Sequence, residues 1–370
     1  MSGTVNLQSR VYNFSAGPAV LPVSVLEKIQ QDLLCLPGAG ASILEISHRS
    51  ADFIAIMESA KSGIRQLLAI PEDYKILFLQ GGSRLQFSMI PMNLLRNSGK
   101  TADYILTGSW GKKACAEAKK EGNVNVVWDG KEGGYSNLPT QNELRLTPDA
   151  AYCYITSNET IEGVQFHAEP DTGNVPLISD ASSDFMHRPL PIEKYGMVYA
   201  CAQKNAGPAG VTVVIAKEEL LTQGADDLPG YLNYKQHLDN DSMYNTPPTF
   251  AIYVLDLVAK WLLNDIGGLD KMHQLNQDKA ALLYDVVDSS NGFYAGHAAK
   301  NCRSLMNVTF RLPNDELQSK FVKQAAERQL TNLKGHRSVG GIRVSIYNAM
   351  PLDGVVAMRD FMREFAQQNA

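Results

Sequence analysis

Lys204 has the sequence neighbours expected of a lysine that does chemistry. It follows the apolar run Val198–Ala202, which is typical of a buried strand, and precedes the turn-forming segment Asn205–Gly210. A lysine usually lies on a solvated surface, where its ammonium group keeps its water. Partial burial lowers the pKa of a lysine and makes its amine a nucleophile. Lys204 is therefore a candidate nucleophile, although a surface lysine at a strand end would have the same neighbours.

Other chemically active residues also follow apolar runs of strand length. Asp180 ends one such run, Thr160 follows a second, and the turn Gly81–Arg84 follows a third. In an open α/β sheet, ligands bind outside the carboxyl ends of the strands. Taken singly, Asp180 fits an N-cap and the glycine turn fits an ordinary strand–helix connection. Together with Lys204 they predict one site, in which the glycine turn and the helix after it favour an anion.

Pyridoxal phosphate is the cofactor that requires this combination. It needs a lysine for its Schiff base, an acid that keeps the pyridine nitrogen protonated, and a phosphate site. An aromatic side chain is expected to stack on its ring. Trp110, which follows another apolar run, is the candidate, although it also fits an ordinary core tryptophan. No metal site is predicted.

The elements that must position these residues follow from the hydrophobic pattern. Most strand-length runs alternate with segments of helical period, such as residues 50–68 and 85–95. This alternation predicts an α/β fold, with a mostly parallel seven-stranded sheet that is covered by helices on both faces. The predicted strands are KILFLQ, ADYILTG, NVNVVWDG, AYCYITS, VPLISD, MVYACA and VTVVIA.

The pattern changes after the last of these strands. A helix is predicted through residues 250–261, with Thr246 as its N-cap, Pro247 at its first position and its end at Gly267. The later segments predict a smaller α+β domain, with helices near residues 274–288, 315–329 and 354–367 and strands near residues 305–312 and 341–349. The predicted organisation is an N-terminal arm (1–16), a large cofactor-binding domain (17–265) and a small C-terminal domain (266–370).

The composition excludes several classes of protein. The chain has 370 residues, is 44% hydrophobic and has a formal net charge of −5, which is typical of a globular protein. No basic cluster alternates with aromatic residues, so no nucleic-acid partner is expected. No apolar run approaches the roughly 20 residues that span a bilayer, and the first residues lack the apolar core of a secretory signal. The five scattered cysteines suit free thiols in a reducing cytoplasm.

Several motifs, taken in order, are together much more specific than any one of them. They are YNFSAGPAVLP, HRS, GGSRLQF, TGSW, TSNETIEGVQF, DASSDF, AQKNAGPAG, YNTPPTFAIY and GHRSVGGIRVSIYNA. With these motifs the chain resembles the phosphoserine aminotransferases, which are fold-type-I enzymes of the class-V group. The resemblance covers nearly the whole chain. It implies the fold-type-I architecture, one pyridoxal 5′-phosphate per subunit and a homodimer.

The resemblance also implies roles for the residues at the strand ends. Lys204 would carry the Schiff base and act as the general base between the substrate Cα and the cofactor C4′. Asp180 would pair with the pyridine nitrogen, and Trp110 would stack on the ring. Thr160 and Gln203 would lie near the 3-hydroxyl group of the cofactor.

The cofactor phosphate is assigned by resemblance to two places in the chain. Ser83 and Arg84 would lie at the phosphate turn that follows the first strand. Asn245 and Thr246 would reach the same phosphate from the partner subunit of the homodimer.

The remaining candidates are cations that would bind substrate. The pairs His48–Arg49 and His336–Arg337 would each fit a solvated loop if taken alone. Arg343 lies in an apolar strand, where a buried guanidinium needs an anion such as an α-carboxylate. By resemblance these residues and Arg84 bind the substrate, whose phosphate supplies a second anion. Which subunit supplies each arginine stays open.

The implied activity is a reversible, ping-pong transamination in the cytoplasm. It converts O-phospho-L-serine and 2-oxoglutarate into 3-phosphooxypyruvate and L-glutamate, within serine biosynthesis. In bacteria a phosphorylated hydroxythreonine in pyridoxal phosphate synthesis is a related substrate. One alternative is a cysteine desulfurase-like lyase, which needs a reactive cysteine on a mobile loop, whereas Cys302 is expected to open a strand. The other alternative, a non-catalytic α/β ligand-binding protein, leaves Lys204 and Asp180 unexplained.

Overall fold

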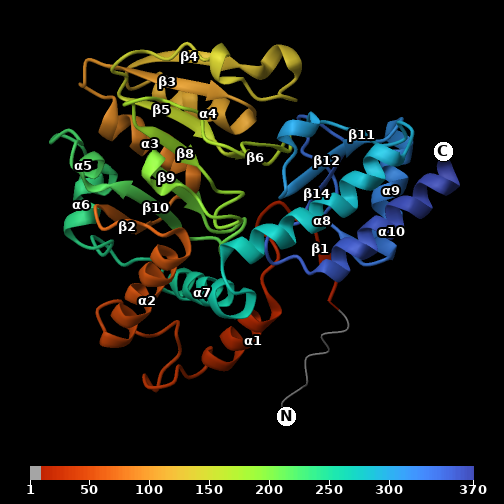
Figure 1. Cartoon of the computed structure of the whole chain (residues 1–370). Coiled ribbons are helices and arrows are strands. Elements are labelled where there is room, and N and C mark those ends of the chain that lie inside the picture. Colours follow the sequence, from red (N-terminus) through yellow and green to blue (C-terminus); the bar gives the residue numbers. More distant parts are fainter. Residues whose placement is uncertain (1–9) are drawn as a thin grey trace.

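A seven-stranded sheet forms the centre of the larger part of the molecule (Figure 1). The computed structural model describes residues 10–370, so the first nine residues of the predicted arm, with most of the segment examined for a secretory signal, lie outside the described residues. The strand order is β2-β10-β9-β8-β5-β3-β4. The strands are β2 (Tyr74–Leu79), β3 (Thr101–Leu106), β4 (Asn123–Asp129), β5 (Tyr152–Thr156), β8 (Leu177–Asp180), β9 (Tyr195–Cys201) and β10 (Thr212–Lys217). Only β10 runs antiparallel to its neighbours, so the predicted mostly parallel sheet is confirmed.

Helices cover both faces of this sheet. Each strand packs against both layers of helices, because its successive side chains point to opposite faces. Ile76 and Phe78 of β2 lie in the core shared with α2 (Ala51–Leu68) and α7 (Thr249–Lys260). Leu77, between them, lies in the core shared with α3 (Gly82–Leu94) and α4 (Ser109–Ala118).

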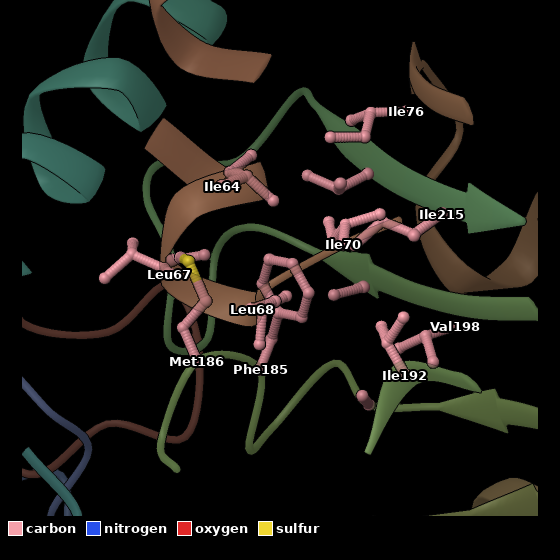
Figure 2. Close-up of a cluster of buried hydrophobic side chains, with 14 of the residues drawn as sticks. Ile64, Leu67, Leu68, Ile70, Ile76, Phe185, Met186, Ile192, Val198 and Ile215 are labelled. Carbon is pink, nitrogen blue, oxygen red and sulfur yellow. The ribbon is translucent and has the colours of Figure 1, made fainter. Parts of the chain in front are cut away.

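The first of these cores joins α2 to the middle of the sheet. Figure 2 shows Leu68 of α2 among side chains from several strands, with Val198 of β9 and Ile215 of β10 on the sheet side. Each large apolar side chain that is fully buried contributes about 1.5–3 kcal/mol. On its other side α2 packs closely on α7, since a Cβ at Gly63 would lie only 3.2 Å from Ala259 Cβ.

The start of α7 differs from the prediction. Thr246 is not the N-cap and Pro247 is not the first helical residue, because the helix begins at Thr249 with Pro248 before it. The reason is the second proline, since a residue that precedes a proline is sterically excluded from helical geometry. Pro247 therefore stays outside the helix. After Lys260 the helix continues as a π-helical turn, Trp261–Ile266. It stops at Gly267, which has a φ of 84°, and this is the end that was predicted from the sequence.

The small domain has its own sheet and core. Its strands β11 (Ala295–Gly296), β12 (Asn307–Arg311) and β14 (Ile342–Ser345) form an antiparallel sheet. The helices α8 (Leu269–Ser289), α9 (Asp315–Glu327) and α10 (Leu352–Asn369) lie beside it (Figure 1). The predicted elements are confirmed, although α8 begins five residues before the predicted start.

The described part of the N-terminal arm joins the small domain. Tyr12–Asn13 forms strand β1, which pairs in parallel with β13 (Leu330–Thr331). Phe14 is fully buried in the same core as α8, α9 and α10. The boundaries 1–16, 17–265 and 266–370 stay predictions. The shorter elements are α1 (Val23–Asp32), α5 (Glu218–Leu221), α6 (Tyr234–Asp239), β6 (Asn158–Glu159) and β7 (Val164–Gln165).

The structure can be compared with the sequence-based expectations about membrane spans and cysteines. In residues 10–370, no helix combines the length and the apolar character that crossing a membrane requires. All five cysteines are free, and only Cys35 is exposed.

Cys302 does not open a strand as predicted. It lies in the 3₁₀ helix Lys300–Cys302, and its thiol contacts the carbonyl groups of Ser136 and Ala299. The strand starts later because Ser304 Oγ accepts the N–H groups of Met306 and Asn307 and keeps the chain in a turn. Burial raises the pKa of the Cys302 thiol, which disfavours the reactive thiolate.

Candidate active site

Lys204 lies just beyond the end of β9, where its amine meets residues from distant segments. Its Nζ donates a hydrogen bond of 2.8 Å to Thr160 Oγ1 and lies 5.2 Å from the centre of the Trp110 ring. Gly17 packs on the stem of the lysine, since a Cβ there would lie 3.3 Å from Lys204 Cγ. The structure thus brings Thr160 into contact with Lys204. The backbone oxygen of Gln203 accepts the N–H of Ala19.

A second lysine is more buried than Lys204 but has a different role. Lys279 of α8 is 3% exposed, and its Nζ donates to the carbonyl oxygens of Ile346, Tyr347, Asn348 and Met350 at 2.9–3.3 Å. Burial lowers its pKa to about 7. Because four backbone groups surround its ammonium, Lys279 holds the chain after β14 in place. Sequence reasoning missed this residue, although its position on the apolar face of α8 is a usable signal.

Asp180 ends β8 and is 4% exposed. Its Oδ1 accepts the N–H of Ser182 at 3.0 Å and also the Ser182 hydroxyl. The chain from Ala181 to His187 forms turns and no helix, so the N-cap interpretation is wrong. Within residues 10–370 no hydrogen bond uses Asp180 Oδ2, which leaves this oxygen for a ligand.

The predicted phosphate turn lies next to Asp180. Gly81 has a φ of 85° and Gly82 a φ of 63°, and α3 starts at Gly82 without a side-chain cap. Ser83 Oγ shares a hydrogen bond of 2.7 Å with Ser182 Oγ, which itself binds Asp180. The glycine turn and the acid are thus joined through two serines, and the uncapped start of α3 is a site for an anion.

Two buried glutamates hold the start of α4, which carries Trp110. Glu159 accepts the backbone N–H groups of Trp110 and Gly111 at 3.0 and 2.8 Å. Glu162 accepts the N–H and the hydroxyl of Ser109. Burial, followed by the charge of Glu162, raises the pKa of Glu159 to about 8, and burial also raises the pKa of Glu162. Gly108 is required beside them, since a Cβ there would lie 2.5 Å from Glu159 Cδ.

Sequence reasoning missed both glutamates as positioning residues. Their signal is the presence of two acids in the stretch Asn158–Gln165, which is buried throughout. At the same edge, Trp110 Nε1 and Thr156 Oγ1 are buried without a hydrogen-bond partner. Unpaired buried polar groups of this kind indicate a ligand site.

Cations surround Trp110 and extend toward the small domain. Arg84 Cζ lies 5.8 Å and Lys113 Nζ 4.1 Å from the centre of the Trp110 ring. Arg343 of β14 is half-buried, and its NH1 lies 3.5 Å from the Thr160 carbonyl oxygen. Burial lowers the pKa of Arg343.

The loop before β14 belongs to the same cationic group. Burial, and then the charges of Arg343, Lys113 and Arg337, lower the pKa of His336. Among the described residues, none of these cations forms an ion pair with an acid. The part of the chain from residue 10 onward also contains no cluster of three or more metal-ligating side chains. The arrangement is therefore suited to bind anions beside an amine nucleophile.

The structure does not bring every predicted residue to this edge. His48 and Arg49 lie in the turn before α2, and within residues 10–370 neither side chain has a hydrogen bond or an ion pair. Asn245 and Thr246 are exposed, and Asn245 Nδ2 donates to Gln80 Oε1 at 3.2 Å. In one chain, these residues do not complete the site.

Comparison with known proteins identifies close relatives. The model of the family Aminotransferase class-V matches residues 11–358. The chain is 62% identical over 362 residues to the phosphoserine aminotransferase of Rhodopirellula baltica, with 98% of this chain and 96% of that protein covered. A solved phosphoserine aminotransferase from Bacillus circulans subsp. alkalophilus has a TM-score of 0.95 at 48% identity, covering 98% of this chain and 99% of that one. The PLP-bound enzyme of the same name from Trichomonas vaginalis has a TM-score of 0.90 at 40% identity, covering 96% of this chain and 100% of that one.

Proposed function

We propose that this chain, which belongs to the aminotransferase class-V family, is a pyridoxal-phosphate-dependent phosphoserine aminotransferase. It transfers the amino group of O-phospho-L-serine to 2-oxoglutarate, and the reverse, in serine biosynthesis. Within the structure, the observation that carries the proposal is the amine of Lys204 between Thr160 and Trp110. The strand next to β9 ends in the buried acid Asp180, whose Oδ2 is left free for a ligand by residues 10–370.

The residues present fit the cofactor. Bound there, pyridoxal phosphate supplies an aldehyde that accepts the amino group and a ring that withdraws electrons. Lys204 Nζ would hold it covalently, and Asp180 Oδ2 would accept the pyridine N–H. Trp110 would stack on the ring, and Ser83 and Arg84 at the start of α3 would hold the phosphate.

Lys204 has a second task after substrate binds. Its amine would take the proton from the substrate Cα and deliver it to C4′ of the cofactor, and the second half-reaction would reverse this transfer. Thr160, which already accepts from Lys204 Nζ at 2.8 Å, keeps that amine in position and lies near the 3-hydroxyl group. Gln203, next to Lys204 in the chain, would also lie near the 3-hydroxyl group of the cofactor.

The cations divide between the two anions of the substrate. Arg343, half-buried in β14, would hold the α-carboxylate that all amino-acid substrates share. The distal phosphate, or the distal carboxylate of glutamate, would be bound by His48, Arg49, Arg84, His336 and Arg337. A phosphate carries nearly two negative charges at neutral pH and accepts several charge-assisted hydrogen bonds.

The test of the proposed function is the visible absorption spectrum of the purified protein. We expect absorption of the aldehyde form before phosphoserine is added and of the amine form afterwards, with reversal by 2-oxoglutarate. A protein without chromophore, or one whose spectrum ignores phosphoserine, would contradict the proposal.

Arg337→Leu is expected to lower kcat/KM for phosphoserine by roughly 10–100-fold, the equivalent of one charge-assisted hydrogen bond. The slow reaction of alanine, which lacks a distal anion, should change far less. Arg343→Leu is the matched control, because it should damage both substrates alike. Steady-state kinetics of both variants decide this, and equal losses in Arg337→Leu would remove Arg337 from the distal site.

We further propose that the enzyme works as a homodimer in the cytoplasm. Asn245 and Thr246 would reach the partner's phosphate site, and the same explanation suits His48 and Arg49. Support comes from large apolar side chains that are exposed near these residues. Leu44 is 60% exposed, and Leu34, Ile54 and Tyr244 are exposed as well.

Sedimentation at working concentration should therefore give a dimer. Leu44→Glu is expected to shift the equilibrium toward monomer and to lower activity in parallel, because a charge would be buried in the interface. Leu352→Glu, at an exposed leucine of α10, should change neither. A fully active monomer would rule out the shared site.

A further inference from the structure

Lys113 is a cation of the site that the proposed function does not use. It lies three residues after Trp110 on α4, so both side chains lie on the same side of the helix. Its Nζ lies 4.1 Å from the centre of the Trp110 ring, closer than the Arg84 guanidinium carbon at 5.8 Å or Lys204 Nζ at 5.2 Å. The side chain is half-buried. Lys113 therefore faces the ligand site, unlike the exposed Lys112 before it.

Without a bound ligand, the surroundings of Lys113 disfavour its positively charged form. Burial lowers its pKa, and the charges of Arg84 and Arg337 lower it further, while Glu159 and Glu162 act in the opposite direction. In residues 10–370 no acid lies within ion-pair distance of Lys113. By contrast, Lys120 after the same helix pairs with Glu117 at 2.6 Å. A cation held among cations in a partly buried site is stabilised when an anion binds there.

The position of Lys113 indicates which anion this is. The charge of Lys113 lowers the pKa of His336, and the charge of Arg337 lowers the pKa of Lys113. His336 and Arg337 both lie in the loop before β14. Arg84, at the cofactor phosphate turn, lies near the same Trp110 ring. Lys113 is therefore near that turn and also feels the charge of the loop that would bind the distal end of the substrate.

We propose that Lys113 is a further specificity-determining residue, which binds the distal anion of the amino-acid substrate together with Arg337. This inference rests on the proposed function. An additional cation beside Arg84 and Arg337 suits a phosphate, because its three terminal oxygens accept more hydrogen bonds than the two oxygens of a carboxylate. Lys113 therefore favours phosphoserine over glutamate, and either over amino acids without a distal anion.

The experiment compares Lys113→Gln with Lys112→Gln. Both replace one lysine of α4 by the same residue, but only one removes a cation from the site. For Lys113→Gln we expect kcat/KM to fall about 10–100-fold for phosphoserine, less for glutamate, and less than about threefold for alanine. Inhibition by inorganic phosphate should weaken about tenfold. Lys112→Gln should behave as the wild type, and Lys113→Arg should restore part of the loss.

The binding of pyridoxal phosphate to the apoenzyme provides a separate readout. We expect Lys113→Gln to leave the apparent Kd of the cofactor unchanged. A raised Kd for the cofactor with unaltered substrate preference would show that Lys113 binds the cofactor phosphate, and this would overturn the inference. Equal losses for phosphoserine and alanine would also overturn it, since they indicate displacement of Trp110. A wild-type protein that does not transaminate phosphoserine would instead contradict the proposed function.

Discussion

Lys204→Ala is expected to abolish transamination, with a loss of at least about 10³-fold, because the variant lacks both the amine that holds the cofactor and the base that moves the Cα proton. The fold should survive, since Nζ makes a single side-chain hydrogen bond, to Thr160. Borohydride reduction of the wild type should attach the cofactor permanently to Lys204, and mass spectrometry should find no such adduct in the variant.

Two controls separate chemistry from charge. Lys204→Arg keeps a cation beside Thr160 but should be equally inactive, because a guanidinium does not form the covalent bond. Lys112→Ala removes an exposed lysine and should keep full activity. Normal turnover by Lys204→Ala would refute the central assignment.

Asp180→Asn is expected to lower kcat by roughly 10–100-fold while part of the cofactor stays bound. The variant can keep the bond from Ser182 to Oδ1, but its amide N–H₂ then faces the pyridine N–H, donor against donor. The loss corresponds to one charge-assisted hydrogen bond, about 1.5–3 kcal/mol. Stopped-flow absorbance during the first half-reaction measures the step directly.

Asp184→Asn is the matched control for this variant. Asp184 lies in the same motif and is equally buried, but its carboxylate accepts from Ser157 Oγ and Gln165 Nε2. Its replacement should reduce stability and leave the rate of the first half-reaction nearly unchanged. If Asp180→Asn retains wild-type kinetics, the acid serves only the local turn.

The sequence predicted much of the large domain because its strands are continuous apolar runs. All seven were found, and β9 and β8 end where Lys204 and Asp180 were expected to meet a ligand. The errors were local. Pro248 moved the start of α7, and Ser304 delayed the start of β12 beyond Cys302. Both depend on how one side chain constrains its neighbours, which a hydrophobic pattern does not record.

By itself, then, the sequence determined the fold class and predicted the lysine, the acid and the glycine turn of the candidate site, since each lies at the end of a segment with a strong local pattern. The tertiary structure decided which distant side chains meet there. Glu159 holds the start of α4 across 48 positions of sequence, and Lys113 meets the charge of Arg337 from the other end of the chain. Such contacts come from the order of the strands and the packing of the small domain. They leave no periodic pattern, because only the folded chain brings those residues together.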